Sequence, residues 1–108
     1  AKVVREYLAR QPSEFLEYPT ILPNWDTTPR YGENSTVMHG STPELFREHL
    51  AIVEEKLKSR SQEHSIVFLK SWNEWGEGNY VEPDTQFGRG YLEAIRDWVD
   101  SPMTNRST

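Results

Sequence analysis

Hydrophobic positions recur with helical spacing in three segments of the chain. Residues 41–60 and 90–100 carry the clearest patterns, and residues 2–10 carry a shorter one. Each segment is therefore predicted to form a helix with one apolar face. The residues on these faces are Leu45, Phe46, His49, Leu50, Val53 and Leu57 in the first segment, Tyr91, Leu92, Ile95, Trp98 and Val99 in the second, and Val3, Val4, Tyr7 and Leu8 in the third.

Two apolar runs without helical spacing lie between these segments. Residues 65–69, continuing to Trp72, are rich in β-branched and aromatic side chains, which is typical of a strand buried on both faces. Residues 20–25 form a second predicted strand, although Pro23 cannot donate a hydrogen bond to a β-ladder. The order helix, strand, helix, strand, helix predicts an α/β fold with parallel strands and right-handed crossovers.

The helix in residues 41–60 has two possible N-terminal caps. Thr42 could cap it with Pro43 at the first helical position. Alternatively, Ser41 could cap it while Glu44 closes a capping box. Either cap starts the helix at nearly the same place.

The length of 108 residues is enough for one small domain, predicted over residues 1–100. Pro102 ends the last helix, and residues 101–108 are expected to form a flexible polar tail. The chain opens at Ala1 inside a predicted helix, as expected for a piece of a longer protein.

Composition excludes several classes of function. The net charge is −5 with scattered Lys and Arg, which argues against a nucleic-acid partner. The absence of Cys excludes a disulfide scaffold and a thiolate metal site, and it fits a reducing compartment. No apolar run approaches the ~18 residues of a membrane span. His39, His49 and His64 lack the spacing of metal ligands, so neither a metal nor a cofactor is expected.

Residues 71–78, directly after the apolar run of residues 65–69, contain the largest group of candidate catalytic residues. Glu74 and Glu77 are three residues apart, between two glycines and the indoles of Trp72 and Trp75. An indole can desolvate one carboxyl group while its neighbour stays ionised, and paired acids are what glycosidic-bond chemistry requires. We expect Trp72 in the core and Trp75 partly exposed. The alternative is a solvated loop whose acids face water or cap the next helix.

Loops after parallel strands share one end of the sheet, so residues 24–31 and 73–84 are expected to meet there. This end offers several groups that could bind a sugar. Asp26 and Arg30 could equally form a structural ion pair, and Tyr80 could simply pack the loop. Asp84 is expected to accept hydrogen bonds from backbone N–H groups in a turn. The candidate binding residues are Asn24, Trp25, Asp26, Arg30, Asn73, Trp75 and Tyr80.

Two blocks of this sequence resemble a known family. Residues 68–84 contain Trp72-Asn73-Glu74-Trp75-Gly76-Glu77-Gly78 and then Glu82-Pro83-Asp84, and residues 87–94 end in Tyr91-Leu92-Glu93-Ala94. These blocks resemble the C-terminal signature of WbsX-like proteins, which belong to bacterial polysaccharide biosynthesis and are similar to family 99 glycoside hydrolases. Residues 19–32, which include Asn24-Trp25-Asp26-Thr27-Thr28-Pro29-Arg30, resemble the preceding strand and loop, so the resemblance covers most of residues 19–95.

The resemblance implies a (β/α)₈ barrel, which takes roughly 250 residues. This chain would supply its last two strand–helix units. Family 99 hydrolases are retaining endo-α-mannosidases that form a 1,2-anhydro intermediate. By this resemblance Glu74 is the base on the sugar 2-hydroxyl, and Glu77 is the general acid and then base. Lys70 and Ser71 depart from the Asn-Ala that commonly precedes the motif, which leaves the substrate open.

The partners implied are an oligosaccharide or polysaccharide substrate and the remainder of the barrel, and family context suggests the cytoplasm. Transfer and hydrolysis of sugars both stay open. A non-catalytic carbohydrate-binding module, or a folded fragment without activity of its own, is the alternative reading.

Overall fold

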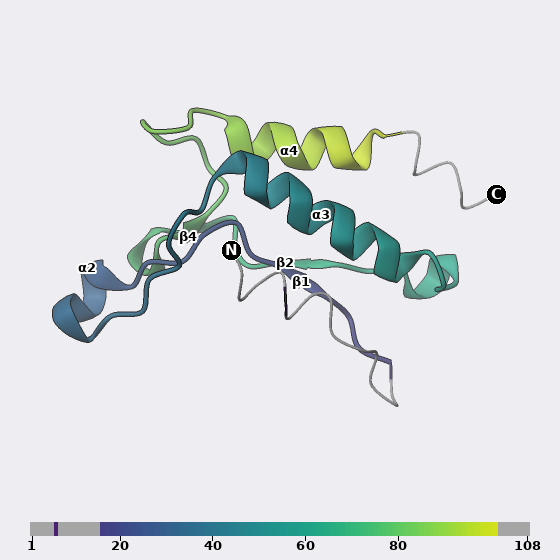
Figure 1. Cartoon of the computed structure of the whole chain (residues 1–108), viewed down its shortest axis with the longest axis horizontal. Coiled ribbons are helices and arrows are strands. Elements are labelled where there is room, and N and C mark those ends of the chain that lie inside the picture. The colour runs from purple at the N-terminus through teal and green to yellow at the C-terminus, as the bar shows by residue number, and fades with distance from the viewer. Residues whose placement is uncertain (1–5, 7–15, 102–108) are drawn as a thin grey trace.

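The computed structural model describes Glu6 and residues 16–101 (Figure 1). The predicted helix over residues 2–10 lies outside this range except for Glu6, and so does the predicted tail from residue 102 onward.

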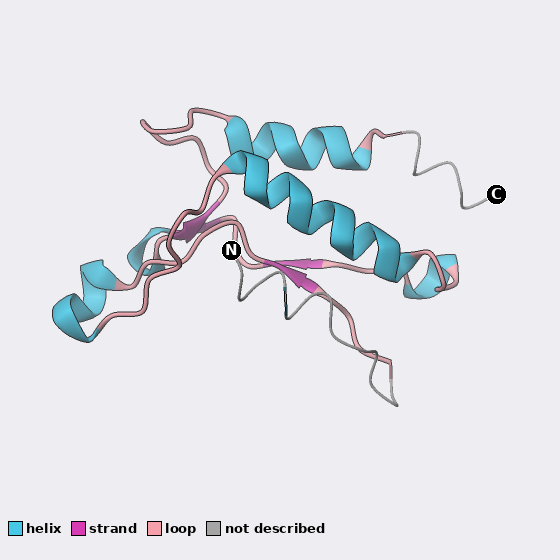
Figure 2. Ribbon diagram, in the orientation of Figure 1, coloured by secondary structure: helices cyan, strands magenta, loops and turns pink. Residues whose placement is uncertain are grey.

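Two short parallel strands organise the fold. Strand β1, Thr20–Ile21, pairs with β2, Phe68–Leu69, in the register Thr20↔Phe68 and Ile21↔Leu69. The backbone N–H of Lys70 extends this ladder by donating to the carbonyl of Ile21 at 3.1 Å. The chain is therefore a mixed α/β structure, and the predicted parallel pairing is confirmed (Figure 2).

Both strands are shorter than predicted. Strand β1 ends at Ile21, two residues before Pro23, which has no N–H to offer a ladder. Before β2, the short 3₁₀ helix η2, Gln62–His64, ends just ahead of the apolar run, and residues 65–67 stay outside the ladder. The ladder therefore holds only two residues of each apolar run.

Two amphipathic helices form the core with the strands. Helix α3, Pro43–Leu57, lies between the strand pair and helix α4, Gly90–Val99 (Figure 1). Burying a large apolar side chain contributes about 1.5–3 kcal/mol, so this layer supplies much of the stability. The buried hydrophobic residues are Ile21, Phe46, Leu50, Val53, Val81, Tyr91 and Ala94. The predicted apolar faces therefore supply most of the core, and His49 is buried on α3 as expected.

The cap of α3 is the first of the two predicted. The Thr42 hydroxyl accepts a hydrogen bond from the backbone N–H of Leu45 at 3.2 Å, and Pro43 occupies the first helical position. The Ser41 hydroxyl instead donates to the carbonyl of Met38. Thr42 therefore satisfies one of the N–H groups that a helix leaves without an internal partner.

Replacing this cap gives a direct test of its contribution. We expect Thr42→Ala to lower the free energy of unfolding by about 1 kcal/mol, because the N–H of Leu45 loses its acceptor. Urea unfolding of the complete protein measures the change. Thr42→Ser keeps the hydroxyl and should recover most of the loss. Equal stability of the alanine variant and the natural protein would contradict the assignment.

The prediction that residues 65–72 are buried on both faces is wrong. Phe68 is 57% exposed, whereas Leu69 packs against the core, because neighbouring residues of a strand point to opposite faces. The prediction of a buried Trp72 is also wrong, since this side chain is 54% exposed. The chain leaves the strand before Trp72, and Val81 takes a fully buried place in the core.

Candidate functional site

The loops that follow β1 and β2 are joined by hydrogen bonds, as expected for the carboxyl end of parallel strands. The side-chain amide of Asn24 donates to the carbonyl of Tyr80 at 3.2 Å and accepts from the N–H of Tyr80 at 2.9 Å. The backbone N–H of Asp26 donates to the carbonyl of Glu77 at 2.8 Å. Asn79, which is fully buried, donates through its amide to the carbonyl of Asn24.

Part of the predicted loop over residues 73–84 is a small hairpin. Strands β3, Asn73–Glu74, and β4, Asn79–Tyr80, pair antiparallel around the 3₁₀ turn η3, Trp75–Glu77. The Ser71 hydroxyl supports the hairpin by accepting from the N–H of Glu74 and donating to the carbonyl of Asn79. The two glutamates therefore stand on an ordered turn.

Glu74 and Glu77 converge on the same cation. Arg30 donates from Nη2 to Glu74 Oε1 at 3.1 Å and from Nη1 to Glu77 Oε1 at 3.3 Å. Lys70 Nζ lies 3.3 Å from Glu77 Oε2. Two cations thus balance two carboxylates. The side chains of Glu74 and Glu77 remain 38% and 24% exposed, so both can be reached from solvent.

Arg30 reaches the glutamates from the first loop. It belongs to the short helix α2, Thr28–Tyr31, which forms inside a segment predicted to be irregular. The predicted alternative of an ion pair with Asp26 is wrong, because Arg30 pairs with the two glutamates. Asp26 Oδ1 accepts from the N–H of Thr28 at 2.9 Å. Hydrogen bonding to Thr28, with a smaller contribution from His39, lowers the pKa of Asp26.

Two glycines permit this close approach. A Cβ on Gly76 would lie 2.9 Å from Nε of Arg30. Gly78 has a φ of 58°, a left-handed conformation that favours glycine, and a Cβ there would lie 2.6 Å from the carbonyl oxygen of Asp26. The glycines of the motif therefore let the first loop pack directly on the turn that carries the glutamates.

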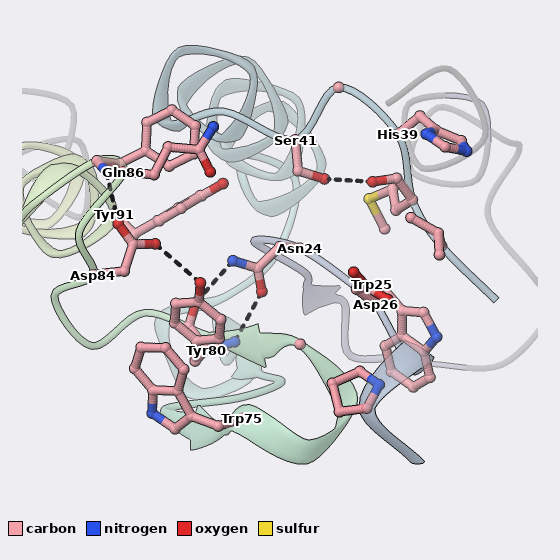
Figure 3. Close-up of a pocket in the computed structure, with 16 residues that line it drawn as sticks. Asn24, Trp25, Asp26, His39, Ser41, Trp75, Tyr80, Asp84, Gln86 and Tyr91 are labelled. Carbon is pink, nitrogen blue, oxygen red and sulfur yellow. Dashed lines mark hydrogen bonds between the residues drawn. The ribbon is translucent and has the colours of Figure 1, made fainter. Parts of the chain in front are cut away.

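An aromatic stack stands beside the carboxylates. The rings of Trp75 and Tyr80 are 3.7 Å apart at an angle of 13° (Figure 3). Trp75 is 45% exposed, as predicted, and its Nε1 donates to Glu82. The Tyr80 hydroxyl donates to Asp84 at 3.0 Å, and burial, together with this contact, raises the pKa of Tyr80 to about 12.

Asp84 fixes the turn that follows the hairpin. Its Oδ1 accepts from the backbone N–H of Phe87, which confirms the predicted turn.

Lys70 contacts the loop that follows β1. Its Nζ lies 5.3 Å from the centre of the Trp25 ring, within range of a cation–π contact. Lys70, which departs from the usual motif, thus contacts both Glu77 and a predicted binding residue.

A pocket of about 470 Å³ opens between the two loops (Figure 3). Five of the predicted binding residues line it: Asn24, Trp25, Asp26, Trp75 and Tyr80. The remaining candidates, Asn73, Arg30, Glu74 and Glu77, are not among the lining residues. Asn73 is exposed and pairs with Tyr80 through its backbone. The candidate site therefore has two neighbouring parts, a carboxylate cluster and a pocket, which share the hairpin.

Sequence reasoning missed Tyr91 as a pocket residue. Its place on the apolar face of α4 matched the pattern of a core residue, and its ring is indeed buried. No local signal distinguishes such a tyrosine from an ordinary core residue. His39 and Gln86 also line the pocket and were not predicted.

Neither a metal-binding cluster nor a membrane-spanning helix is present among the described residues. In residues 16–101 and Glu6, no group of three or more His, Asp or Glu side chains is placed to hold a metal ion. Within the same part of the chain, no helix has the length and apolar character needed to cross a bilayer.

These features define an α/β protein with paired carboxylates and an aromatic pocket at the carboxyl end of a parallel strand pair. The family model described as Glycosyltransferase WbsX matches residues 1–95. The chain therefore belongs to the WbsX glycosyltransferase family, which confirms the resemblance seen in the sequence.

Relatives support the same membership. The chain is 32% identical over 96 residues to the "Uncharacterized protein WxcX" of two strains of Xanthomonas campestris pv. campestris. This match covers 88% of the chain and 14% of WxcX, so the chain spans a small part of the length of these relatives. No solved structure matches the chain.

Proposed function

We propose that the complete protein makes or breaks glycosidic bonds during assembly of a bacterial cell-surface polysaccharide, with Glu74 and Glu77 as the reacting carboxylates. The observation that carries this proposal is the convergence of both glutamates on Arg30, beside the stack of Trp75 and Tyr80. A glycosidic bond requires a proton donor and a base on one site, and an aromatic face suits a sugar ring.

We also propose that β1 and β2 are neighbouring strands of a (β/α)₈ barrel. Their parallel pairing, with α3 between them in sequence, supports this architecture. The position of the carboxylate cluster beyond the carboxyl ends of the strands supports it further, because active sites of such barrels lie at that face.

The contacts of the two glutamates differ, and this difference bears on their roles. Among the described residues, Glu74 meets Arg30 through Oε1 alone, whereas Glu77 accepts from Arg30 at one oxygen and from Lys70 at the other. Glu74 therefore has an oxygen available to take a proton. Both oxygens of Glu77 are engaged, so substrate binding would move Lys70 or Arg30 to bring the leaving oxygen into contact with this carboxyl group.

The proposed reaction follows from these roles and from the likeness to family 99 hydrolases. Glu74 takes the proton of the sugar 2-hydroxyl, whose oxygen bonds to the anomeric carbon while the glycosidic bond breaks. Glu77 gives its proton to the leaving oxygen. In the second step Glu77 takes a proton from water or from an acceptor hydroxyl, which opens the anhydro ring, and Glu74 returns its proton to the 2-oxygen.

Isotope labelling separates transfer from hydrolysis. The complete protein would be incubated in H₂¹⁸O with α-linked oligosaccharides and nucleotide sugars, and the products analysed by mass spectrometry. Hydrolysis places ¹⁸O in the released reducing end, whereas transfer lengthens an acceptor without label. If no member of the panel gives either product, the proposed activity is contradicted.

A second candidate is a carbohydrate-binding module without chemistry. The observation that favours it is the absence of Glu74 and Glu77 from the pocket lining, together with their engagement by Arg30 and Lys70. This module would bind oligosaccharides, with a change in tryptophan fluorescence, and would form no product. The labelling experiment therefore also separates the two candidates.

A further inference from the structure

The pocket contains a buried hydroxyl that the proposed chemistry does not use. Tyr91 is 2% exposed, and the proton of its hydroxyl has no acceptor among the described residues. Figure 3 shows this hydroxyl directed into the pocket. Phe46 and Phe87 pack edge-to-face on the ring, with centres 5.6 and 5.9 Å away, and hold it in this direction.

The one neighbouring side chain that acts on this hydroxyl does not accept its proton. The amide of Asn24 donates to and accepts from the backbone of Tyr80, and its remaining N–H acts on Tyr91 as a donor, which can serve the phenolic oxygen but not the O–H. Burial raises the pKa of Tyr91 to about 12, against a smaller lowering by Asn24, so the hydroxyl keeps its proton at neutral pH. A buried polar group without a partner costs free energy, and a ligand that supplies one recovers that cost.

The lining of the pocket limits what the ligand can be. It combines the Trp75–Tyr80 stack and Phe87 with polar groups such as Ser41 and Gln86. It contains two carboxylates, Asp26 and Asp84, and no Lys or Arg. A phosphate or a sugar acid would meet two carboxylates, with the imidazole of His39 as the one basic side chain in the lining. The volume of about 470 Å³ lies in the range of small-molecule sites.

We propose that this pocket is a subsite for one neutral pyranose unit, whose ring lies against the aromatic side chains and whose hydroxyl hydrogen-bonds to Tyr91. The inference rests on the proposed function, because the unit belongs to the glycan whose bond reacts at Glu74 and Glu77. Trp75 and Gly78 line the pocket and flank Glu77 on the same turn, so the bound unit is adjacent to the reacting bond. The charged part of a nucleotide sugar lies elsewhere.

Binding of simple glycosides to the complete protein tests the subsite. The probes are neutral methyl pyranosides (glucoside, galactoside, mannoside and rhamnoside), with methyl glucuronide and uridine diphosphate as charged probes, titrated by NMR. We expect at least one neutral probe to bind, and Tyr91→Phe to weaken it about tenfold, the loss of one hydrogen bond. Tyr31→Phe, at an exposed tyrosine outside the lining, is the matched control and should bind as the natural protein does.

Two further measurements keep the test decisive. Tyr91→Phe should not lower the melting temperature, because the phenyl ring fills the same space and removes a buried hydroxyl without a partner. Deoxy analogues of the bound pyranoside should lose affinity for the natural protein at one ring position, and Tyr91→Phe should no longer distinguish that analogue from its parent. Binding of no neutral probe, stronger binding of the charged probes, or unchanged affinity of Tyr91→Phe would each overturn the subsite.

The outcome separates this inference from the proposed function. If Glu74→Gln abolishes turnover while Tyr91→Phe binds pyranosides normally, the subsite is wrong and the chemistry stands. If Tyr91→Phe weakens binding while Glu74→Gln leaves turnover intact, the pocket binds sugar and the proposed role of the glutamates is wrong.

Discussion

Glu74→Gln and Glu77→Gln are each expected to lower turnover by the complete protein about 10²–10⁴-fold, the usual contribution of a general acid or base. Glutamine keeps the size of the side chain and cannot exchange a proton with the substrate. Both glutamates are partly exposed, and exposed ion pairs contribute roughly 0–1 kcal/mol, so each variant should remain folded. Initial rates, with circular dichroism as a check on folding, measure the effect.

Glu55→Gln is the control for these variants. Glu55 pairs with Lys58 on the exposed side of α3, far in sequence from the hairpin, and its replacement should leave the rate unchanged. Turnover within a few-fold of the natural rate in both hairpin variants would end the assignment of Glu74 and Glu77 as reacting groups. Loss in only one variant would limit the chemistry to that carboxylate.

Gly78→Ala is expected to cause the largest loss of stability, about 2–5 kcal/mol in the free energy of unfolding. Two costs add at this residue. The left-handed backbone, with φ of 58°, disfavours any side chain, and the new Cβ would press on the backbone of Asp26 at 2.6 Å. Since Asp26 precedes the helix that carries Arg30, the same change should displace the cation from the glutamates and lower activity.

Gly88→Ala separates the two costs. Gly88 has nearly the same φ, 57°, but nothing lies within 4 Å of a Cβ built there. Its replacement should cost only the backbone term of about 1–2 kcal/mol. Urea unfolding of both variants gives the comparison. Equal losses at the two glycines would show that the contact with Asp26 is not tight.

The features that the sequence predicted well are those set by neighbouring residues. Thr42 and Pro43 start α3 where the cap signal placed them, and the apolar face of that helix becomes buried. The parallel pairing followed from the alternation of helices and strands, and from it the meeting of the two loops. Each of these features depends on periodicity or on a short start signal.

The predictions that were wrong concern contacts between residues distant in the sequence. An ion pair between Arg30 and Asp26 was one of two predicted alternatives, but the partners of Arg30 lie 44 and 47 residues away, at positions that only the folded chain brings together. Trp72 was expected in the core, yet its side chain is exposed, whereas Val81 in the following loop is fully buried. For Tyr91, helical spacing correctly predicted a buried ring but gave no information on the direction of its hydroxyl.

The double hydrogen bond between Asn24 and Tyr80 has a mechanical consequence. One carboxamide replaces a whole rung of β-sheet, acting as donor and acceptor to the same residue across 56 positions of sequence. Asn24 thus joins the two loops through its side chain. Aspartate could not replace it, because an aspartate carboxylate has no N–H to donate. A ligand that displaces Tyr80 is therefore expected to displace Asn24 as well, and with it the segment that carries Arg30.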